Sequence, residues 1–405
     1  MQRPADLTLE HPTENRTIGF STGRILGKGT TALVLEGVDC VTGNPVAIKR
    51  IDLAAIRKAD VYADREIKIM TERLLGLPNL VQIEARSAEP GMARYVYIVM
   101  TYGELGSLSN FLNDRYRSPL DARMQVSLMH GIANGLAFMH EKNVLHCDLK
   151  SGNVVLKANP IPGGIPIPLI CDFGFSRIID DPFHSLTKIS GSPPNMPPEH
   201  LRKYVKRALP PHPHSEKTDV YSAIIMFMGI ILGEEDAFPW FKDNMNITLP
   251  EEKLYIWNTK DLDLRVLVIW VCIKNMRAKF PPDTDENLKN LIEQGWSSIP
   301  EKRQTALELC AQLAAILLTL PPTNFPVALL SQKKYSNSSE SSYDSSTISS
   351  SAFFDRVPRV KAFVGKKAIE EARADLVAGG SLTIFPKRGK ISTKPDVIFR
   401  RKCKP

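Results

Sequence analysis

Three polar residues in the middle of the sequence have the types and the order that phosphoryl transfer requires. Asp148 is followed five residues later by Asn153, and a second carboxylate, Asp172, comes further along the chain. Asn153 and Asp172 would supply the oxygen ligands that hold Mg²⁺. Asp148 would orient an attacking hydroxyl and accept its proton. Each residue alone could be a turn, cap or loop residue, but the three in this order favour phosphoryl transfer.

A second group of residues lies closer to the N-terminus. Gly27 and Gly29 belong to a turn between apolar segments, where backbone N–H groups could approach a phosphate chain. Lys49 ends the strand-like run Val46–Lys49, and Glu66 follows on a helix-like stretch. Alone, the turn is better explained as a plain hairpin, Lys49 as a solvated charge and Glu66 as a solubilising residue. Together, they could hold and orient a nucleotide.

The first hundred residues predict a strand-rich lobe with one main helix. Strands are expected from about Ile18 to Ile51, separated by glycine-containing turns. A helix is expected from about Ala54 to Leu75, and the β-branched and aromatic run Tyr95–Thr101 predicts another strand.

After Gly103 the pattern becomes mostly helical. The spacing predicts a helix from about Leu120 to Glu141, and its apolar face comprises Val126, Met129, Ala133, Leu136 and His140. Short strands are expected at Val154–Leu156 and Leu169–Cys171, a long loop over residues 174–199, and mainly helices over residues 219–320, with Val220–Leu232 buried.

Composition separates the C-terminal end from the rest. Residues 331–351 contain eleven serines in 21 positions, which predicts a disordered linker. From Asp355 onward there are fourteen basic against five acidic residues, whereas the remainder is close to neutral. A short helix over Ala368–Val377 and a hairpin over Ser381–Phe399, turning near residues 387–389, are expected. The tail could contact an acidic or anionic partner, although a solvated charge run explains it more simply.

The six cysteines are scattered without CxxC pairs, which suits a reducing compartment and argues against a zinc cluster or a disulfide framework. The N-terminus is polar, and the longest apolar run is shorter than the roughly 20 residues that span a bilayer. We therefore expect no transmembrane segment and a cytoplasmic protein, with the nucleus left open by the basic tail.

With these motifs in order, the sequence resembles the eukaryotic protein kinase family over roughly residues 18–322. The turn at residues 27–34 resembles the glycine-rich loop over ATP, and Val46–Lys49 resembles the third-strand lysine motif. Residues 146–148 resemble the catalytic loop, and Asp172–Phe173–Gly174 the metal-binding triplet. Pro197–Pro198–Glu199 resembles the element that closes the activation segment.

Residues further along the chain extend the resemblance. Asp219 falls where the family braces the catalytic loop, and Arg303 where an arginine pairs with the glutamate at position 199. The pattern from Trp296 to Arg303 leans toward the tyrosine-kinase-like group of serine/threonine kinases.

The resemblance also implies roles for individual residues. Lys49, held by Glu66, would orient the α- and β-phosphates, and Lys150 would steady the γ-phosphate and indicates a serine/threonine kinase. Ser192 would bond both Asp148 and Lys150. Nucleotide binding is implied for Ile25, Leu26, Gly27, Gly29, Val34, Ala47, Lys49, Thr101, Gly103 and Val155.

Some positions depart from the family pattern. Ala32 replaces the third glycine of the loop, and Cys147 replaces the arginine that pairs with an activation-loop phosphate in many relatives. We therefore hypothesise that activity does not require phosphorylation of Ser176, Ser185, Thr187 or Ser190. Pro194 and Asn195 are unusual in the substrate-docking loop. His212 and His214 lie in an apparent insertion, for which a flexible surface loop is more plausible than a metal site.

These observations predict a bilobal α+β kinase fold. The expected parts are an N-terminal extension (residues 1–17), a β-rich N-lobe (18–101), a larger helical C-lobe (104–322), a serine-rich linker (323–354) and a basic tail (355–405). The predicted activity is ATP- and Mg²⁺-dependent phosphorylation of serine or threonine in protein substrates. The alternative is a catalytically weak pseudokinase that acts as a scaffold. The oligomeric state is left open.

Overall fold

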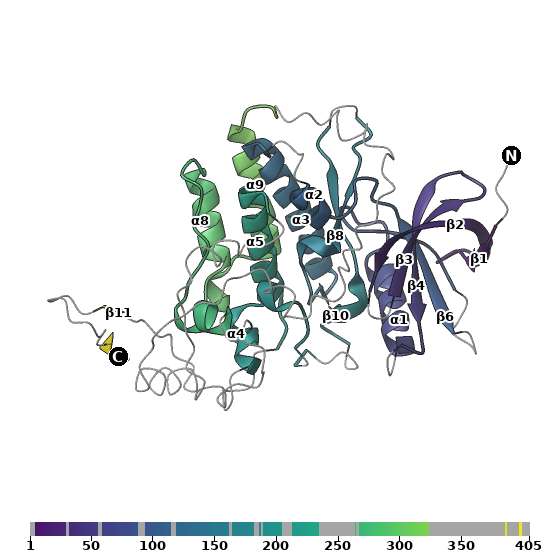
Figure 1. Ribbon diagram of the computed structural model, residues 1–405, viewed down its shortest axis with the longest axis horizontal. Helices are drawn as coiled ribbons and strands as arrows, with labels where there is room; N and C mark the ends of the chain where they lie inside the picture. Colours follow the sequence, from purple (N-terminus) through teal and green to yellow (C-terminus); the bar gives the residue numbers. More distant parts are fainter. Residues whose placement is uncertain are drawn as a thin grey trace.

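An antiparallel sheet of six strands forms the N-terminal lobe (Figure 1). Its strand order is β1-β2-β3-β4-β6-β5, and a single pairing of Glu10 with Arg86 joins the two outer strands into a closed barrel. The computed structural model describes residues 5–29, 32–55, 59–87, 94–114, 119–161, 164–181, 186–187, 189–204, 213–234, 264, 267–323, 385–386 and 397–398. The strands of this sheet are β1 (Leu7–Glu10), β2 (Thr17–Lys28), β3 (Ala32–Asp39), β4 (Pro45–Asp52), β5 (Ile83–Arg86) and β6 (Tyr95–Thr101).

The sheet starts before residue 18, where the N-lobe was expected to begin. β1 pairs with β2 from Leu7↔Phe20 to Glu10↔Thr17, and buries Leu9 against Ile18 and Phe20. A four-residue strand with one buried apolar side chain carries too little periodicity to be recognised locally. Residues 7–10 are therefore part of the sheet, although the sequence placed them in an extension.

The helix beside this sheet, α1 (Ala59–Lys68), is shorter than predicted and continues as a π-helical turn over Ile69–Arg73. Residues 52–55 form a turn instead, in which the Asp52 carboxylate accepts from the Ala54 N–H. The buried face of α1 includes Ala63 and Glu66. A buried glutamate on a helix needs a partner, because an isolated charge is costly to remove from water.

Helices dominate the C-terminal lobe (Figure 1). Asp121 caps α3, its carboxylate accepting from the Met124 N–H, so the helix starts two residues later than expected. The predicted apolar face of α3 is confirmed, because all five of its residues are buried. The helices are α2 (Leu108–Asn113), α3 (Ala122–Glu141), α4 (Pro198–Leu201), α5 (Glu216–Leu232), α8 (Glu286–Gly295) and α9 (Ala306–Thr319).

The buried helix expected at Val220–Leu232 is α5. Ser215 and Thr218 form a reciprocal capping box at its start, which satisfies backbone donors that the helix leaves free. At its end, Gly233 has φ +70, the left-handed conformation that glycine adopts without a steric penalty. These caps define α5 at both ends.

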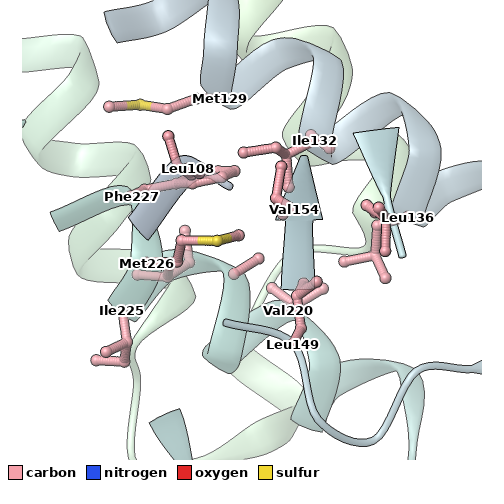
Figure 2. Packing of buried hydrophobic residues seen from close by; sticks show 14 of the residues in the cluster. Leu108, Met129, Ile132, Leu136, Leu149, Val154, Val220, Ile225, Met226 and Phe227 are labelled. Carbon is pink, nitrogen blue, oxygen red and sulfur yellow. The ribbon is translucent and has the colours of Figure 1, made fainter. Parts of the chain in front are cut away.

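The core of the C-lobe lies between α2, α3, α5 and the strand β8 (Val154–Lys157), as Figure 2 shows. Phe227 and Met226 of α5 face Leu108 of α2 and Met129 of α3 in this view. Phe227 is fully buried. Its truncation to alanine would cost about 3–5 kcal/mol of unfolding free energy. α5 is thus a rigid base for the loops that contact its N-terminal end.

Two small antiparallel sheets accompany the helices of the C-lobe. β8 pairs with β9 (Ile167–Ile170), and β7 (Val144–Leu145) pairs with β10 (Arg177–Ile178). The expected strands at 154–156 and 169–171 are therefore confirmed to within two residues at their ends. The expected loop over residues 174–199 differs, since it contains β10 and short 3-10 turns such as Pro193–Asn195.

Most of the predicted linker and tail lies outside the described residues, including the expected helix over residues 368–377. Within the span of the expected hairpin, β11 (Phe385–Pro386) pairs with β12 (Val397–Ile398) in antiparallel fashion. The expected turn at residues 387–389 is also outside the described residues. Among the residues that the structure describes, no helix is long and apolar enough to cross a membrane.

Candidate active site

A buried carboxylate holds the backbone of the loop that carries Asp148. Asp219, in the first turn of α5, accepts the main-chain N–H groups of His146 (2.7 Å) and Cys147 (2.9 Å). Burial would raise the pKa of Asp219, but hydrogen bonds from His140 and from the backbone outweigh it and lower the pKa. Cys147 has φ +66, so the loop turns sharply there. Asp219 is therefore placed to brace the loop, as expected.

Asp148 is held by donors on both sides. Its Oδ1 accepts the N–H and the Oγ–H of Ser192, each at 2.8 Å. Lys150 Nζ donates to Ser192 Oγ at 2.9 Å and lies 3.4 Å from Asp148 Oδ2. Asn153 Nδ2 donates to the Asp148 carbonyl at 2.8 Å. The structure thus brings together four residues that are separated by up to 44 positions in the sequence.

Asp172 follows β9 in the left-handed conformation, with φ +63. The main-chain N–H of Cys171 donates to the Asn153 carbonyl at 2.9 Å, which ties the two expected metal ligands together. The side-chain nitrogen Nδ2 of Asn153 donates to Asp148, so the side-chain oxygen Oδ1 is the atom left to accept. Amide and carboxylate oxygens are the donor set that suits Mg²⁺, which is commonly bound by few protein ligands and completed by phosphates and water.

A lysine between two carboxylates links the lobes. Lys49 Nζ donates to Glu66 Oε1 at 2.6 Å and to Asp172 Oδ1 at 2.9 Å. Burial disfavours the ammonium, but the two carboxylates outweigh it and raise the pKa of Lys49. Lys49 in turn lowers the pKa of Asp172 to about 2. Burial raises the pKa of Glu66 despite Lys49, since Glu66 is almost fully enclosed.

The register of the sheet places several expected nucleotide-binding residues next to one another. Val34 on β3 stands opposite Gly27 on β2 and Lys49 on β4. Ala47 stands opposite Met100 on β6. These pairings place the glycine turn and Lys49 on either side of Val34.

The expected hinge adjoins the C-lobe. Gly103 packs so closely on Val155 that a Cβ at this position would lie 2.8 Å from the Val155 Cβ. The Thr101 N–H is already used, because it donates to the Gln82 carbonyl at 2.9 Å. Ile25 and Leu26 are exposed on β2, and Gly29 lies just beyond it. Ile25 was expected to share the adenine site with Ala47 and Val155. In the sheet, Ile25 stands opposite Leu35 on β3.

Comparison with known proteins identifies the family to which the chain belongs. Residues 20–313 match the protein kinase domain family. The chain belongs to this family. It is 30% identical to the serine/threonine-protein kinase atg1 of Dictyostelium discoideum over 52% of the chain and 30% of that protein. It is 28% identical to the serine/threonine-protein kinase CTR1 of Arabidopsis thaliana over 70% of the chain and 30% of that protein.

A third relative is the serine/threonine-protein kinase 33 of Mus musculus, 27% identical over 81% of the chain and 61% of that protein. The matched regions thus span less than two thirds of each relative's length. The expected family and bilobal fold are confirmed, and a protein kinase domain in general uses ATP and a divalent metal.

The segment that closes the kinase active site is anchored at its C-terminal end. Arg303 donates to both carboxylate oxygens of Glu199, at 2.7 and 2.8 Å, and both side chains are buried. Arg303 also donates to the Lys217 carbonyl and stacks over the Tyr221 ring. Removing one member of such a buried pair costs about 3–5 kcal/mol. The pairing expected from the sequence is therefore present.

His214 was wrongly expected to lie in a flexible surface loop. Its side chain is buried, its ring stacks edge-on against the His200 ring at 4.5 Å, and its Nε2 accepts the Ser190 N–H at 3.2 Å. Burial lowers the pKa of His214 to about 3, so the ring is neutral near pH 7. Among the described residues no group of three His, Cys, Asp or Glu side chains could hold a metal ion, and His212 lies outside them.

His214 and Gly191 are the residues of the kinase site that the sequence analysis missed. Gly191 has φ +111, and a Cβ there would lie 2.8 Å from the Cys147 carbonyl. Its place directly before Ser192 could have drawn attention to it. His214 carries no local signal other than its position before the cap of α5.

The residues that depart from the kinase pattern are accommodated in the structure. Cys147 is buried, its pKa is raised by burial, and its Sγ faces the Leu145 carbonyl at 3.7 Å, so it is an unreactive thiol. Ala32 begins β3 and packs against the core. Burial also raises the pKa of Cys171 to about 12.

Proposed function

We propose that this chain is an ATP- and Mg²⁺-dependent protein serine/threonine kinase. The observation that carries the proposal is the pair of linked networks around Asp148 and around Lys49. One holds a carboxylate with Ser192, Lys150 and Asn153, and the other joins Glu66, Lys49 and Asp172 across the lobes. The relatives named above are serine/threonine kinases, which supports the same substrate class.

Asp148 is the proposed positioning base. Its Oδ1 accepts two hydrogen bonds from Ser192. Among the described residues, its Oδ2 accepts only from Asn153 Nδ2, at 3.3 Å, and lies 3.4 Å from Lys150, so Oδ2 is the oxygen that would accept the proton of a substrate hydroxyl. As that proton leaves, the hydroxyl oxygen forms a bond to the γ-phosphorus of ATP, and the bond from this phosphorus to the β–γ bridging oxygen breaks. ADP is the leaving group. Lys150 would steady the negative charge on the transferred group.

Lys49 is the proposed ligand of the α- and β-phosphates, and Glu66 holds it in place. The bound Mg²⁺ would neutralise phosphate charge, with Asn153 and Asp172 as its protein ligands. Gly27, Gly29 and Val34 would cover the phosphates, and Ala47, Val155, Ile25 and Leu26 the adenine. Thr101 and Gly103 would form the hinge beside it.

The scaffold alternative has no observation in its favour. A protein that only binds partners has no physical need for a base, two metal ligands and an oriented lysine in hydrogen-bonding register. The role of the basic tail, the tyrosine-kinase-like assignment and a cytoplasmic location stay predictions from the sequence.

The test is transfer of labelled phosphate from ATP to a generic basic protein with Mg²⁺. The wild type is compared with Asp148→Asn and Lys49→Met. Asp148→Asn removes the proposed base, which is worth about 10²–10⁴-fold in rate. Lys49→Met removes the proposed phosphate ligand and should also abolish nearly all transfer. Acid hydrolysis of the product should release phosphoserine and phosphothreonine. Measurable ATP binding without transfer by the wild type would reverse the choice in favour of the scaffold.

A further inference from the structure

A groove opens on the C-lobe far from the phosphate-binding residues. It has a volume of about 270 Å³ and lies where the start of α3, the end of α5, the start of α8 and the end of α9 meet (Figure 1). A cavity of roughly 150 Å³ holds a benzene-sized group, so this groove would take about two apolar side chains. Its lining is Ala122, Gln125, Val126, Ile231, Pro281, Asp283, Thr284, Asp285, Leu288, Ile316 and Leu320.

The floor and the rim of the groove differ in chemistry. The floor is apolar, formed by buried side chains from four helices, whereas Asp283 and Asp285 stand exposed on the rim. The nearby cation Arg123 is engaged, since its Nη1 donates to the carbonyls of Leu317 and Leu320. The groove therefore suits an apolar segment that is followed by positive charge.

The chain itself arrives at this groove. Leu320 at the end of α9 lines it, and three residues later Thr323 is tied down, its Oγ1 donating to Asp121 Oδ2 at 2.6 Å. Asp121 is the cap of α3, next to Ala122 on the groove wall. The last residue described before residue 385 is therefore fixed at the edge of the groove.

The sequence after Thr323 has the matching chemistry. Residues 324–334 are Asn-Phe-Pro-Val-Ala-Leu-Leu-Ser-Gln-Lys-Lys, an apolar run followed by two lysines. At roughly 3.3 Å per extended residue, the seven residues from Thr323 to Leu330 reach as far as about 23 Å. Lys333 and Lys334 would then meet the acidic rim.

We propose that the groove between α3, α5, α8 and α9 is the docking site of the chain's own segment Phe325–Leu330, with Lys333 and Lys334 against Asp283 and Asp285. Docking would fix the start of the serine-rich region beside the C-lobe. The tether gives this segment a high effective concentration at the groove, which a free partner lacks.

Hydrogen exchange on the full chain is the first test. The variant Leu329→Asp/Leu330→Asp is compared with the wild type and with Phe353→Asp/Phe354→Asp, which makes two similar changes further along the tail. Exchange over residues 122–126 and 286–291 should accelerate at least about fivefold in the first variant and stay unchanged in the second. Equal exchange in all three proteins would overturn the proposal.

A labelled peptide of residues 324–334 provides the second test. It should bind saturably to the Leu329→Asp/Leu330→Asp chain, and about tenfold more weakly to wild type, whose own segment competes. Ala122→Trp, which fills the groove, should abolish binding, whereas Ala122→Ser should not. Asp283→Lys should weaken binding, and a peptide carrying Lys333→Glu and Lys334→Glu should recover it.

Other occupants predict different results. If oleate protects the same residues and the peptide does not bind, the groove is an acyl-chain site and the proposal is wrong. If the Leu329→Asp/Leu330→Asp change converts a dimer to a monomer, the occupant is a second copy, and the proposal is equally wrong.

Discussion

The buried imidazole of His214 accepts a hydrogen bond from the main-chain N–H of Ser190, with 3.2 Å between the two nitrogens. Two residues later, Ser192 donates its N–H and its hydroxyl to Asp148. Between them, Gly191 lies so close to the Cys147 carbonyl, in the loop that carries Asp148, that a side chain at position 191 would not fit. His214 is therefore coupled to the proposed base through three consecutive residues.

We predict that His214→Phe lowers kcat about tenfold and leaves KM for ATP within about twofold of wild type. Phenylalanine keeps the packing against His200 but leaves the Ser190 N–H without an acceptor, at a cost of about 1–3 kcal/mol. Steady-state kinetics measure the split. His214→Gln, whose Oε1 can replace Nε2, should recover most of the loss. A fall in thermal stability with unchanged kcat would show a structural role only.

Ser192 provides a second prediction, because its hydroxyl lies between Asp148 and Lys150. Ser192→Ala removes the donor to Asp148 and the acceptor for Lys150 but leaves the main-chain bond. We expect kcat to fall about 10–100-fold, since a charge-assisted hydrogen bond is worth about 1.5–3 kcal/mol. Ser192→Thr keeps the hydroxyl and should retain at least about half the rate. Equal losses in both variants would mean that shape, not the hydroxyl, matters here.

The residues of the proposed site were easier to recognise in the sequence than the residues that hold them in place. Lys49, Asp148, Asn153 and Asp172 each lie in a short motif whose spacing is visible locally. By contrast, His214 bonds a residue 24 positions away, and its burial depends on packing against His200. A histidine between prolines has the local composition of a loop, so only the tertiary structure reveals its role.

The distinction between local pattern and tertiary contact also explains which elements of the fold were predicted from the sequence and which were not. Tyr95–Thr101 was predicted to the residue, because seven β-branched, aromatic or apolar positions form a central strand. β1 was missed, because its place depends on pairing with β2 and β5. Similarly, Ala54 was expected to be helical but lies in a turn, where its N–H donates to the Asp52 carboxylate, and helical periodicity does not encode such a local side-chain acceptor.

The hypothesis that activation-loop phosphorylation is dispensable leads to a third prediction. Ser176 is fully buried and donates to the His146 carbonyl at 3.3 Å, so a kinase cannot reach it in this conformation. Cys147 offers no positive charge to a phosphate. We expect phosphatase-treated protein, and Thr187→Ala protein, to retain activity within about threefold, because Cys147 stands where an arginine would pair with such a phosphate.

The measurement is the initial rate of the treated protein, with its phosphate content checked by mass spectrometry. Ser185 belongs to the same hypothesis but lies outside the described residues, so it is tested by the phosphatase and by Ser185→Ala. Ser190→Ala tests the fourth position of the hypothesis, and it leaves in place the main-chain N–H of residue 190 that donates to His214. A tenfold or larger loss on dephosphorylation would contradict the hypothesis.

The Lys49 network has a defined pH dependence. Asp172 has a pKa of about 2, below its ordinary 3.8, so its stabilising contribution is present above pH 3.8 and is lost as the pH falls through 2. The raised pKa of Lys49 stabilises the fold below pH 10.5, and this stabilisation is lost as the pH rises through the folded-state pKa of Lys49. The raised pKa of Glu66 acts oppositely to that of Asp172, since stability falls as the pH rises above 4.5 toward the folded pKa of Glu66.

Lys49→Met should therefore make stability depend more steeply on pH. Without the ammonium, burial and the nearby Asp172 raise the pKa of Glu66 further, so the variant loses stability over a wider range above pH 4.5. Thermal unfolding from pH 5 to pH 8 should show the gap to wild type widening by on the order of 5 °C. Lys49→Met/Glu66→Gln removes the titrating carboxyl and should restore a constant gap. Parallel curves for wild type and Lys49→Met would show that Glu66 stays ionised without its partner, which the burial of this side chain argues against.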